Sequence, residues 1–153
     1  MSTAPAAASA GQCPTLTVPS NPRVLSVART FVEAICKARQ VDRTTIQAVV
    51  LATGEAVTNI VRHAHRDRPD TPFQIECRVG PDTVEITLID QGAPFDLTRV
   101  PHLNPSELRC GGRGVYLMRV LMDEIRCEPL GDHGNRLRLV KRWPSKPCVR
   151  HCG

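Results

Sequence analysis

Two segments of alternating apolar residues, with a turn between them, constrain the fold of this chain most strongly. Every second residue is apolar in residues 73–79, and the same pattern returns in residues 84–88. Gly80, Pro81 and Asp82 stand between them and are typical of turns. Because side chains alternate between the two faces of a strand, the pattern predicts an antiparallel hairpin with one buried face. A layer of helices is then expected to cover that face.

Two helical segments precede the hairpin and can supply this layer. Residues 15–18 predict a short strand, after which Ser20 is a candidate N-cap for a helix that runs to about Arg39. Asp42 is a candidate N-cap for a second, longer helix that ends near His65. Apolar residues recur at helical spacing in both segments. The first helix is expected to bury Val24, Val27, Ala28, Phe31, Val32 and Ile35, and the second to bury Ile46, Val49, Thr53, Val57 and Ile60.

An irregular segment, a third helix and a second hairpin follow. Residues 96–110 contain two prolines and little periodicity, so we expect a mobile segment there. A helix begins around residues 112–114, and residues 125–128 and 136–141 predict the closing hairpin. The third helix is expected to bury Val115, Leu117, Val120 and Leu121. The order β-α-α-β-β-α-β-β predicts an α+β fold, a two-layer sandwich of antiparallel strands with helices on one face.

The charge of the chain is unevenly distributed. The formal net charge is +5, but six basic and no acidic residues follow residue 132, which leaves 14 basic against 15 acidic residues in residues 1–132. We expect a domain at residues 15–142, a disordered leader at residues 1–14 and a basic, cysteine-containing tail at residues 143–153. The near-neutral body and the five aromatic residues disfavour direct nucleic-acid binding.

The N-terminus and the cysteines bear on the compartment. No apolar run approaches the roughly 20 residues of a membrane span, and the N-terminus lacks the basic and apolar parts of a signal peptide. The seven cysteines are scattered without paired CxxC spacing. Cys148, His151 and Cys152 could bind a metal, although free thiols in a reducing compartment are the simpler interpretation. We therefore expect a cytoplasmic protein with no membrane partner.

The second helix carries a single charged residue, Glu55, within residues 46–61. Glu55, Asn59 and His63 follow at four-residue steps, so their side chains are expected to share one face, opposite the apolar one. Such a face is ordinarily solvated, but its neighbours here are small or apolar. Gly54 costs about 1 kcal/mol relative to alanine inside a helix, which indicates that another group approaches closely there.

Two further clusters contain glycine. Asp90, Gln91 and Gly92 end the second strand of the first hairpin, with Phe95 and Asp96 shortly after; alone, this motif is common in turns. The sequence Gly111-Gly112-Arg113-Gly114 opens the third helix. Its glycines leave backbone N–H groups uncovered at the positive end of the helix dipole, which suits an anion. Neither the Walker A pattern nor the dinucleotide-binding fingerprint is present.

Taken together, in this order and spacing, the clusters resemble the GHKL ATPase superfamily. The matching positions are Glu55-Ala56-Val57-Thr58-Asn59, His63-Ala64, Asp90-x-Gly92, Phe95-Asp96, Gly112-Arg113-Gly114 and Leu121-Met122-Asp123-Glu124. Within it, residues 16–141 resemble the small anti-sigma-factor serine kinases of bacterial partner-switching systems. The resemblance implies the Bergerat fold, with a mixed, mostly antiparallel sheet and a mobile ATP lid at residues 96–110.

The resemblance also implies ATP and Mg²⁺ as cofactors and assigns site residues. Asn59 would help to hold Mg²⁺ against the phosphates, Glu55 would be the catalytic base that takes the substrate serine proton, and His63 would lie near the phosphates. Asp90 would accept a hydrogen bond from the adenine amino group, and Gly92 would let the backbone approach the base. The ATP-binding positions implied are Asn59, His63, Asp90, Gly92, Phe95, Gly111, Gly112, Arg113 and Gly114.

The function that the resemblance implies is that of a kinase and an anti-sigma factor. Such a protein binds a sigma factor and phosphorylates a STAS-type anti-anti-sigma antagonist on serine or threonine. It is also expected to form a homodimer and to use its first helix and neighbouring residues for partner contacts.

Some positions depart from the family pattern. Pro94 stands where a second glycine is common, and His65 replaces a more usual aromatic residue. Asn135 occupies the place of a threonine that assists adenine binding, so it is a candidate to take over that task. The tail beyond Trp143 has no counterpart in the family.

Three other functions remain open at this point. The chain could be a non-catalytic, ATP-regulated binding module of the same fold, or a switch kinase that acts on a phosphatase pathway. It could also bind nucleic acid through the basic tail, which would require a steep salt dependence. A histidine kinase is disfavoured because no helix pair with a phosphoacceptor histidine precedes the ATPase part.

Overall fold

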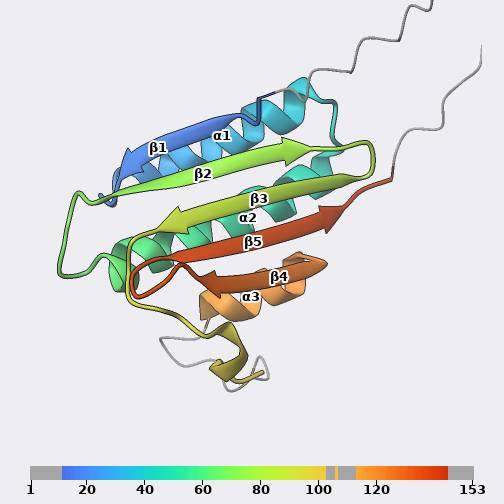
Figure 1. The fold of residues 1–153 in the computed structure, drawn as a ribbon. Coiled ribbons are helices and arrows are strands. Elements are labelled where there is room, and N and C mark those ends of the chain that lie inside the picture. The colour runs from blue at the N-terminus through green and yellow to red at the C-terminus, as the bar shows by residue number, and fades with distance from the viewer. Residues whose placement is uncertain (1–11, 103–105, 107–112, 145–153) are drawn as a thin grey trace, which may run out of the picture.

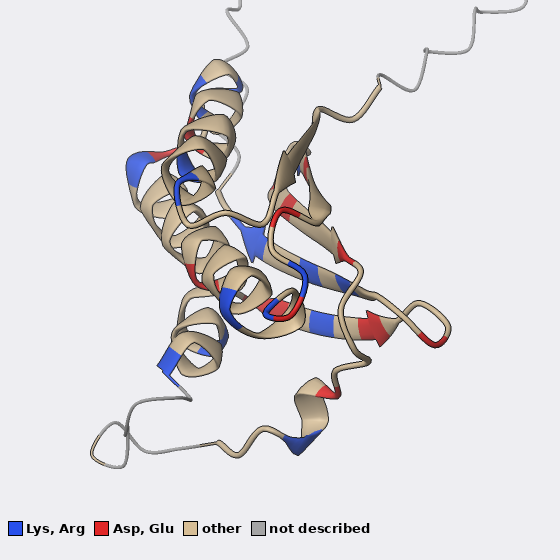
Figure 2. Ribbon diagram, turned by 90° about the vertical axis from the view of Figure 1, so that its left-hand side faces the viewer, with Lys and Arg blue, Asp and Glu red and all other residues tan. Residues whose placement is uncertain are grey.

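A single five-stranded sheet and a layer of helices form the molecule. The computed structural model describes residues 12–102, 106 and 113–144. The strand order is β1-β2-β3-β5-β4, and each neighbouring pair is antiparallel. The α-helices lie together on one face of the sheet (Figure 1), and Figure 2 shows the two layers from the side. The predicted α+β, two-layer architecture is confirmed.

The two predicted hairpins both form. The strands are β1 (Thr15–Pro19), β2 (Pro72–Val79), β3 (Thr83–Asp90), β4 (Glu124–Pro129) and β5 (Asn135–Arg142). β2 pairs with β3 and β4 with β5, while β3 pairs with β5 in a register that sets Asp90 opposite Asn135. The alternating apolar residues face the helices: Phe73, Ile75, Cys77, Val84, Ile86 and Leu88 are buried.

The first helix begins later than predicted and buries a different face. α1 (Val24–Ala38) buries Val24, Ala28, Val32 and Cys36, with Phe31 and Ile35 partly buried beside them. The predicted burial of Val27 is wrong, because 47% of this residue is exposed. Ser20 does not cap the helix. Arg23 holds the N-cap position without a side-chain hydrogen bond, and the Ser20 hydroxyl donates to the Thr71 carbonyl oxygen instead.

The second helix follows the prediction except in its last turn. α2 (Arg43–Asn59) begins after Asp42, and the five residues predicted to face the core are all buried. The chain continues as a π-helical turn, η1 (Ile60–Ala64), in which the His65 N–H donates to the Ile60 carbonyl oxygen. Such wider turns occur frequently at functional sites. The helical segment therefore ends near His65, as predicted, but with a changed side-chain spacing after Asn59.

Replacing Asp42 tests the N-cap. The Asp42 carboxylate accepts hydrogen bonds from the Thr45 hydroxyl and backbone N–H, and these bonds hold the pKa of Asp42 below its ordinary 3.8. Asp42→Ala is expected to lower the free energy of unfolding by about 1 kcal/mol, whereas Asp42→Asn should retain most of it. Because the folded pKa is lowered, this contribution is present above pH 3.8 and is lost as the pH falls through the folded value. Urea unfolding of both variants at neutral and acidic pH checks the cap; equal stabilities of wild type and Asp42→Ala would contradict it.

The third helix and the segment before it complete the fold. The segment expected to be irregular contains a 3₁₀ turn, η2 (Leu97–Arg99), after which residues 103–105 and 107–112 lie outside the described part. α3 (Arg113–Leu121) buries Val115 and Met118, while Val120 is 60% exposed, so its predicted burial is wrong. Trp143 packs against the core, and its backbone N–H donates to Asp82.

The described residues bear on two expectations, the absence of a membrane span and the state of the cysteines. None of the described helices is long and apolar enough to cross a membrane. The described cysteines, Cys13, Cys36, Cys77 and Cys127, are free thiols. The candidate metal residues Cys148, His151 and Cys152 lie outside the described residues.

Candidate active site

Glu55, Asn59 and Gly114 meet where α2 packs against the start of α3. A Cβ atom placed on Gly114 would lie 3.0 Å from Glu55 Oε2 and 3.5 Å from Asn59 Oδ1. Glu55 and Asn59 are both half-buried, one helical turn apart. Two residues of the predicted polar face therefore contact the N-terminal turn of α3, where backbone N–H groups lack helical partners and favour an anion.

His63 lies in the π-helical turn η1 and not in α2, and its side chain is exposed. The structure brings Glu55 and Asn59 together at Gly114. The position of His63 near the phosphates stays a prediction.

Asp90 ends β3 with one carboxylate oxygen occupied. Its Oδ1 accepts hydrogen bonds from the Gly92 N–H at 2.8 Å and from Asn135 Nδ2 at 3.1 Å. The residue is buried, yet its Oδ2 has no hydrogen bond to the described residues. The bonds to Oδ1 fix the carboxylate orientation and leave Oδ2 available to accept from a ligand amino group.

Asn135 connects Asp90 to the following loop. Besides its bond to Asp90, its Nδ2 donates to the Ala93 carbonyl oxygen at 2.9 Å, and its Oδ1 accepts from the Phe95 N–H at 2.8 Å. Asn135 is 3% exposed, and its bond to Asp90 is buried, whereas its bonds to Ala93 and Phe95 are partly buried. A threonine hydroxyl has one proton to donate, so it could not replace both bonds that Asn135 Nδ2 donates.

Gly92 lies against the end of η1. A Cβ atom on Gly92 would stand 2.6 Å from Ala64 Cβ and 2.8 Å from the Ala64 Cα and carbonyl oxygen. The family resemblance implies that glycine here lets the backbone approach a base. In the structure Gly92 also has a close protein neighbour, Ala64, so the Asp90 turn packs directly onto η1, the continuation of the helix that carries Asn59.

Substitution of Gly92 is expected to separate these two elements. Gly92→Ala should lower the free energy of unfolding by about 1–3 kcal/mol, because the clash involves backbone atoms that cannot move aside cheaply. Gly80→Ala, in the turn of the β2–β3 hairpin, is the matched control, since its Cβ would meet the Thr83 Oγ1 at 3.2 Å and the backbone no closer than the Thr83 carbonyl oxygen at 3.6 Å. Chemical unfolding of both variants measures the difference; equal losses would contradict the close packing.

The other predicted ATP-binding positions are less constrained. Phe95 is 45% exposed, so its ring is available to a ligand although its backbone is held by Asn135. Arg113 is the exposed first residue of α3. Gly111 and Gly112 lie outside the described residues.

Arg119 is a residue that sequence reasoning missed. Its guanidinium, on α3, donates to the carbonyl oxygens of Leu97, Val100 and Pro101 at 3.0–3.1 Å. The Asp96 side chain caps η2 through Thr98, whose hydroxyl and N–H lower the pKa of Asp96. Nothing in the residue pattern could reveal Arg119, because its partners are backbone carbonyls.

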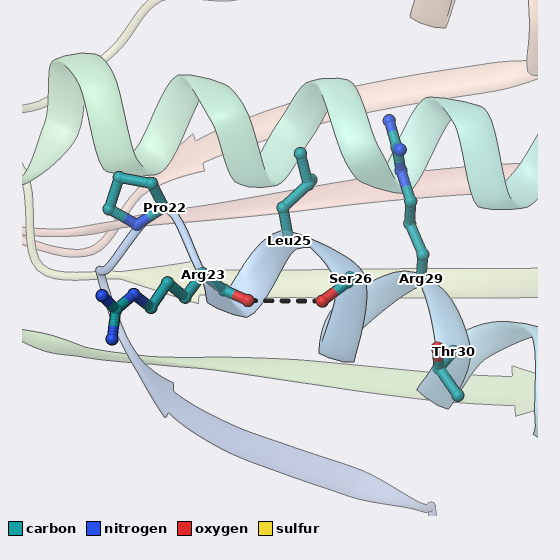
Figure 3. Close-up of a pocket in the computed structure, with 6 residues that line it drawn as sticks. All are labelled: Pro22, Arg23, Leu25, Ser26, Arg29 and Thr30. Atoms are coloured by element: carbon teal, nitrogen blue, oxygen red, sulfur yellow. Dashed lines mark hydrogen bonds between the residues drawn. The ribbon is translucent and has the colours of Figure 1, made fainter.

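A separate pocket lies beside α1 (Figure 3). Its lining residues are Pro22, Arg23, Leu25, Ser26, Arg29 and Thr30. The Arg29 side chain extends from α1 toward α2, where its Nε would lie 2.6 Å from a Cβ on Gly54. The close approach predicted from Gly54, the residue before Glu55, is therefore made by Arg29.

Relatives of known class share this chain's sequence pattern. Residues 18–141 match the histidine kinase-like ATPase domain family. The serine-protein kinase RsbW of Listeria innocua is 31% identical over 120 residues, which cover 73% of this chain and 76% of that protein. RsbW of Bacillus subtilis is 29% identical over 119 residues, covering 72% and 74% respectively.

Solved structures show the same fold. A chain in the crystal structure of the SiaB-SiaC complex from Pseudomonas aeruginosa has a TM-score of 0.64 at 14% identity, covering 83% of this chain and 88% of that one. The structure of RsbU and RsbW domains from a Mycobacterium tuberculosis protein gives 0.62 at 18% identity, covering 87% of this chain and 34% of that one. The chain therefore belongs to the histidine kinase-like ATPase domain family and, within it, to the RsbW-like anti-sigma-factor group of ATP-binding protein-serine/threonine kinases.

Proposed function

We propose that this kinase transfers the γ-phosphate of ATP to a serine or threonine of a STAS-type antagonist protein and that it binds a sigma factor in alternation with that antagonist. The observation that carries the proposal is the convergence of the Glu55 carboxylate and the Asn59 carboxamide on Gly114. This arrangement combines a proton acceptor, an oxygen ligand and a helix N-terminus, which are the groups that phosphoryl transfer needs.

In this proposal Glu55 is the general base. Its carboxylate accepts the proton of the substrate hydroxyl while that oxygen attacks the γ-phosphorus of ATP. The bond between the γ-phosphorus and the bridging oxygen breaks, and ADP leaves with the electron pair. The N-terminal turn of α3 at Gly114 stabilises the negative charge on the transferring group through its free N–H groups.

The residues present suit Mg²⁺ and adenine at two ends of one nucleotide. Mg²⁺ prefers oxygen ligands and keeps several waters, and the Asn59 carboxamide oxygen beside Gly114 would hold it together with the phosphates. When bound, the ion supplies charge neutralisation. Asp90 would accept the adenine amino group at Oδ2, since Oδ1 is already occupied by Gly92 and Asn135.

Partner contact is proposed at α1. Arg23 and Arg29 give the pocket of Figure 3 a positive character, and the apolar Val27 is exposed on the same helix. Basic and apolar groups side by side suit a partner segment with both acidic and apolar residues. Because Arg29 packs on Gly54, a protein docked there would lie next to the helix segment that carries Glu55. The same family resemblance favours a homodimer.

One assay tests the proposal. The chain is incubated with radiolabelled ATP, Mg²⁺ and the STAS-type protein from its own source, and label transfer to serine or threonine is measured. Transfer to that protein, together with capture of a sigma factor in the absence of the antagonist, is the expected result. ATP binding without transfer would leave an ATP-regulated binding module, and transfer without sigma capture would favour a switch kinase.

A further inference from the structure

His65 lies at the centre of a hydrogen-bond chain that reaches the Asp90 turn. The residue is 1% exposed, directly after η1. Its Nε2 accepts from the Gln91 backbone N–H at 2.9 Å, and its Nδ1 lies 2.7 Å from the Ser20 hydroxyl. The Ser20 hydroxyl in turn donates to the Thr71 carbonyl oxygen at 2.7 Å. The ring thus connects the residue after β3 with the residue after β1 and, through it, with the loop before β2.

The partners of His65 define its protonation. Because a backbone N–H can only donate, Nε2 must carry a lone pair, and the ring proton of a neutral imidazole is on Nδ1. Nδ1 then donates to Ser20, whose own proton is used toward Thr71. Burial lowers the pKa of His65 below its ordinary 6.5, since desolvation disfavours the imidazolium. Of the charged groups facing the ring, Asp90 on β3 opposes this shift and Arg68 in the loop adds to it.

Gln91 is held on several sides. Besides the bond to His65, its carbonyl oxygen accepts from the Arg68 guanidinium, and its Nε2 donates to the Pro72 carbonyl oxygen at 3.2 Å. Arg68 and the Gln91 side chain are exposed, whereas the bond to His65 is partly buried and its acceptor ring is 1% exposed. The bond to His65 is therefore expected to contribute most to the position of Gln91, since exposed hydrogen bonds compete with water.

We infer that His65 is a positioning residue for base recognition, which acts by holding Gln91 so that the adjacent Asp90 presents Oδ2 at a fixed place to the adenine amino group. This role rests on the proposed contact between Asp90 and adenine. Gly92 packs on Ala64, the residue before His65. The end of η1 therefore contacts two consecutive residues of the turn, Gln91 through the His65 ring and Gly92 through Ala64. No other described side chain bonds to the Gln91 N–H.

Three variants separate the two ring nitrogens. His65→Gln places an acceptor near the position of Nε2 and keeps the Gln91 bond, whereas His65→Asn keeps a donor near Nδ1 for Ser20 and loses Gln91. Ser20→Ala removes the bonds of the Ser20 hydroxyl to His65 and to the Thr71 carbonyl oxygen, leaves the Gln91 bond in place and is the matched control for His65→Gln. Dissociation constants for ATP and GTP are measured for all three chains and the wild type, together with amide hydrogen exchange at Gln91 and thermal stability.

The expected result is specific to one variant. His65→Asn should bind ATP about tenfold more weakly with little change for GTP, and the Gln91 amide should exchange faster. His65→Gln and Ser20→Ala should retain the preference for ATP. The ratio of wild-type to His65→Gln affinity for ATP should fall as the pH drops below 6.5. The reason is that protonation of the His65 ring at Nε2 removes the lone pair that accepts from the Gln91 N–H. Dividing the wild-type affinity by that of His65→Gln at each pH removes the pH effects that the two chains share.

Two outcomes would overturn the role of His65 and leave the proposed adenine contact of Asp90 in place. Unchanged ATP affinity and Gln91 exchange in His65→Asn would do so, as would equal losses of stability and ATP affinity in all three variants, which indicate a purely structural residue. A wild-type chain that binds ATP and GTP equally would overturn the proposed adenine contact of Asp90, and the inference with it.

Discussion

Glu55→Gln is expected to abolish most phosphotransfer while leaving ATP binding unchanged. The substitution keeps the size of the side chain and its place beside Gly114 but removes the ability to accept a proton. General-base catalysis typically contributes about 10²–10⁴-fold to a rate, and a loss in this range is expected in the antagonist phosphorylation assay. Affinity for ATP should change little because no step of nucleotide binding uses the Glu55 carboxylate.

A matched control distinguishes the role of Glu55 from a general effect of charge. Glu124→Gln removes a surface carboxylate on β4, away from α1, where Glu124 pairs with Arg142 at 3.4 Å, and should leave the transfer rate unchanged. The free energies of unfolding of both variants should match that of the wild type within about 0.5 kcal/mol. Normal transfer by Glu55→Gln would exclude it as the base.

Asp90→Asn is expected to weaken ATP binding by roughly 100-fold while the chain stays folded. The Gly92 N–H and the Asn135 amide both donate to Oδ1, so the new carboxamide must direct its oxygen toward them. Its NH₂ group then replaces Oδ2 and faces the adenine amino group, donor against donor. The opposite orientation would set the NH₂ group against those donors inside the protein and is disfavoured.

Nucleotide selectivity gives this prediction a second measurement. A donor at the position of Oδ2 suits the carbonyl oxygen of guanine, so the ratio of ATP to GTP affinity should fall by more than ATP affinity alone requires. Asp82→Asn, in the turn between β2 and β3, is the control and should retain wild-type affinities for both nucleotides. If Asp90→Asn still preferred ATP, the base would have to be recognised elsewhere.

Local sequence patterns predicted the parts of the fold whose causes are local. The alternation in residues 73–79 and 84–88 predicted β2 and β3, and Asp42 caps α2 through its neighbour Thr45, as its position indicated. Ser20 failed as a cap because its hydroxyl is used by Thr71, 51 residues away. A residue next to a helix predicts a cap only while no distant partner competes for its side chain.

The sequence indicated which residues belong to the candidate site but not how they are connected. The polar spacing indicated Glu55 and Asn59, which the structure brings together at Gly114, and the family resemblance indicated Asp90 and Gly114. The π-helical turn after Asn59 leaves no signal in the sequence pattern, so the change from α2 to η1 before His63 could not be predicted. The departure at His65 was visible, but its partners Gln91 and Ser20 come from distant segments.

The packing of Arg29 on Gly54 also constrains how this kinase can change in evolution. Any side chain at position 54 would displace the Arg29 guanidinium, whose buried Nε has no hydrogen-bond partner among the described residues. Because the guanidinium is the far end of a flexible side chain, a substitution at position 54 is expected to move Arg29 and not the backbone of either helix. Since Gly54 lies beside Glu55 and Arg29 lines the α1 pocket, a lineage that changes one of these two positions also changes the surroundings of the other.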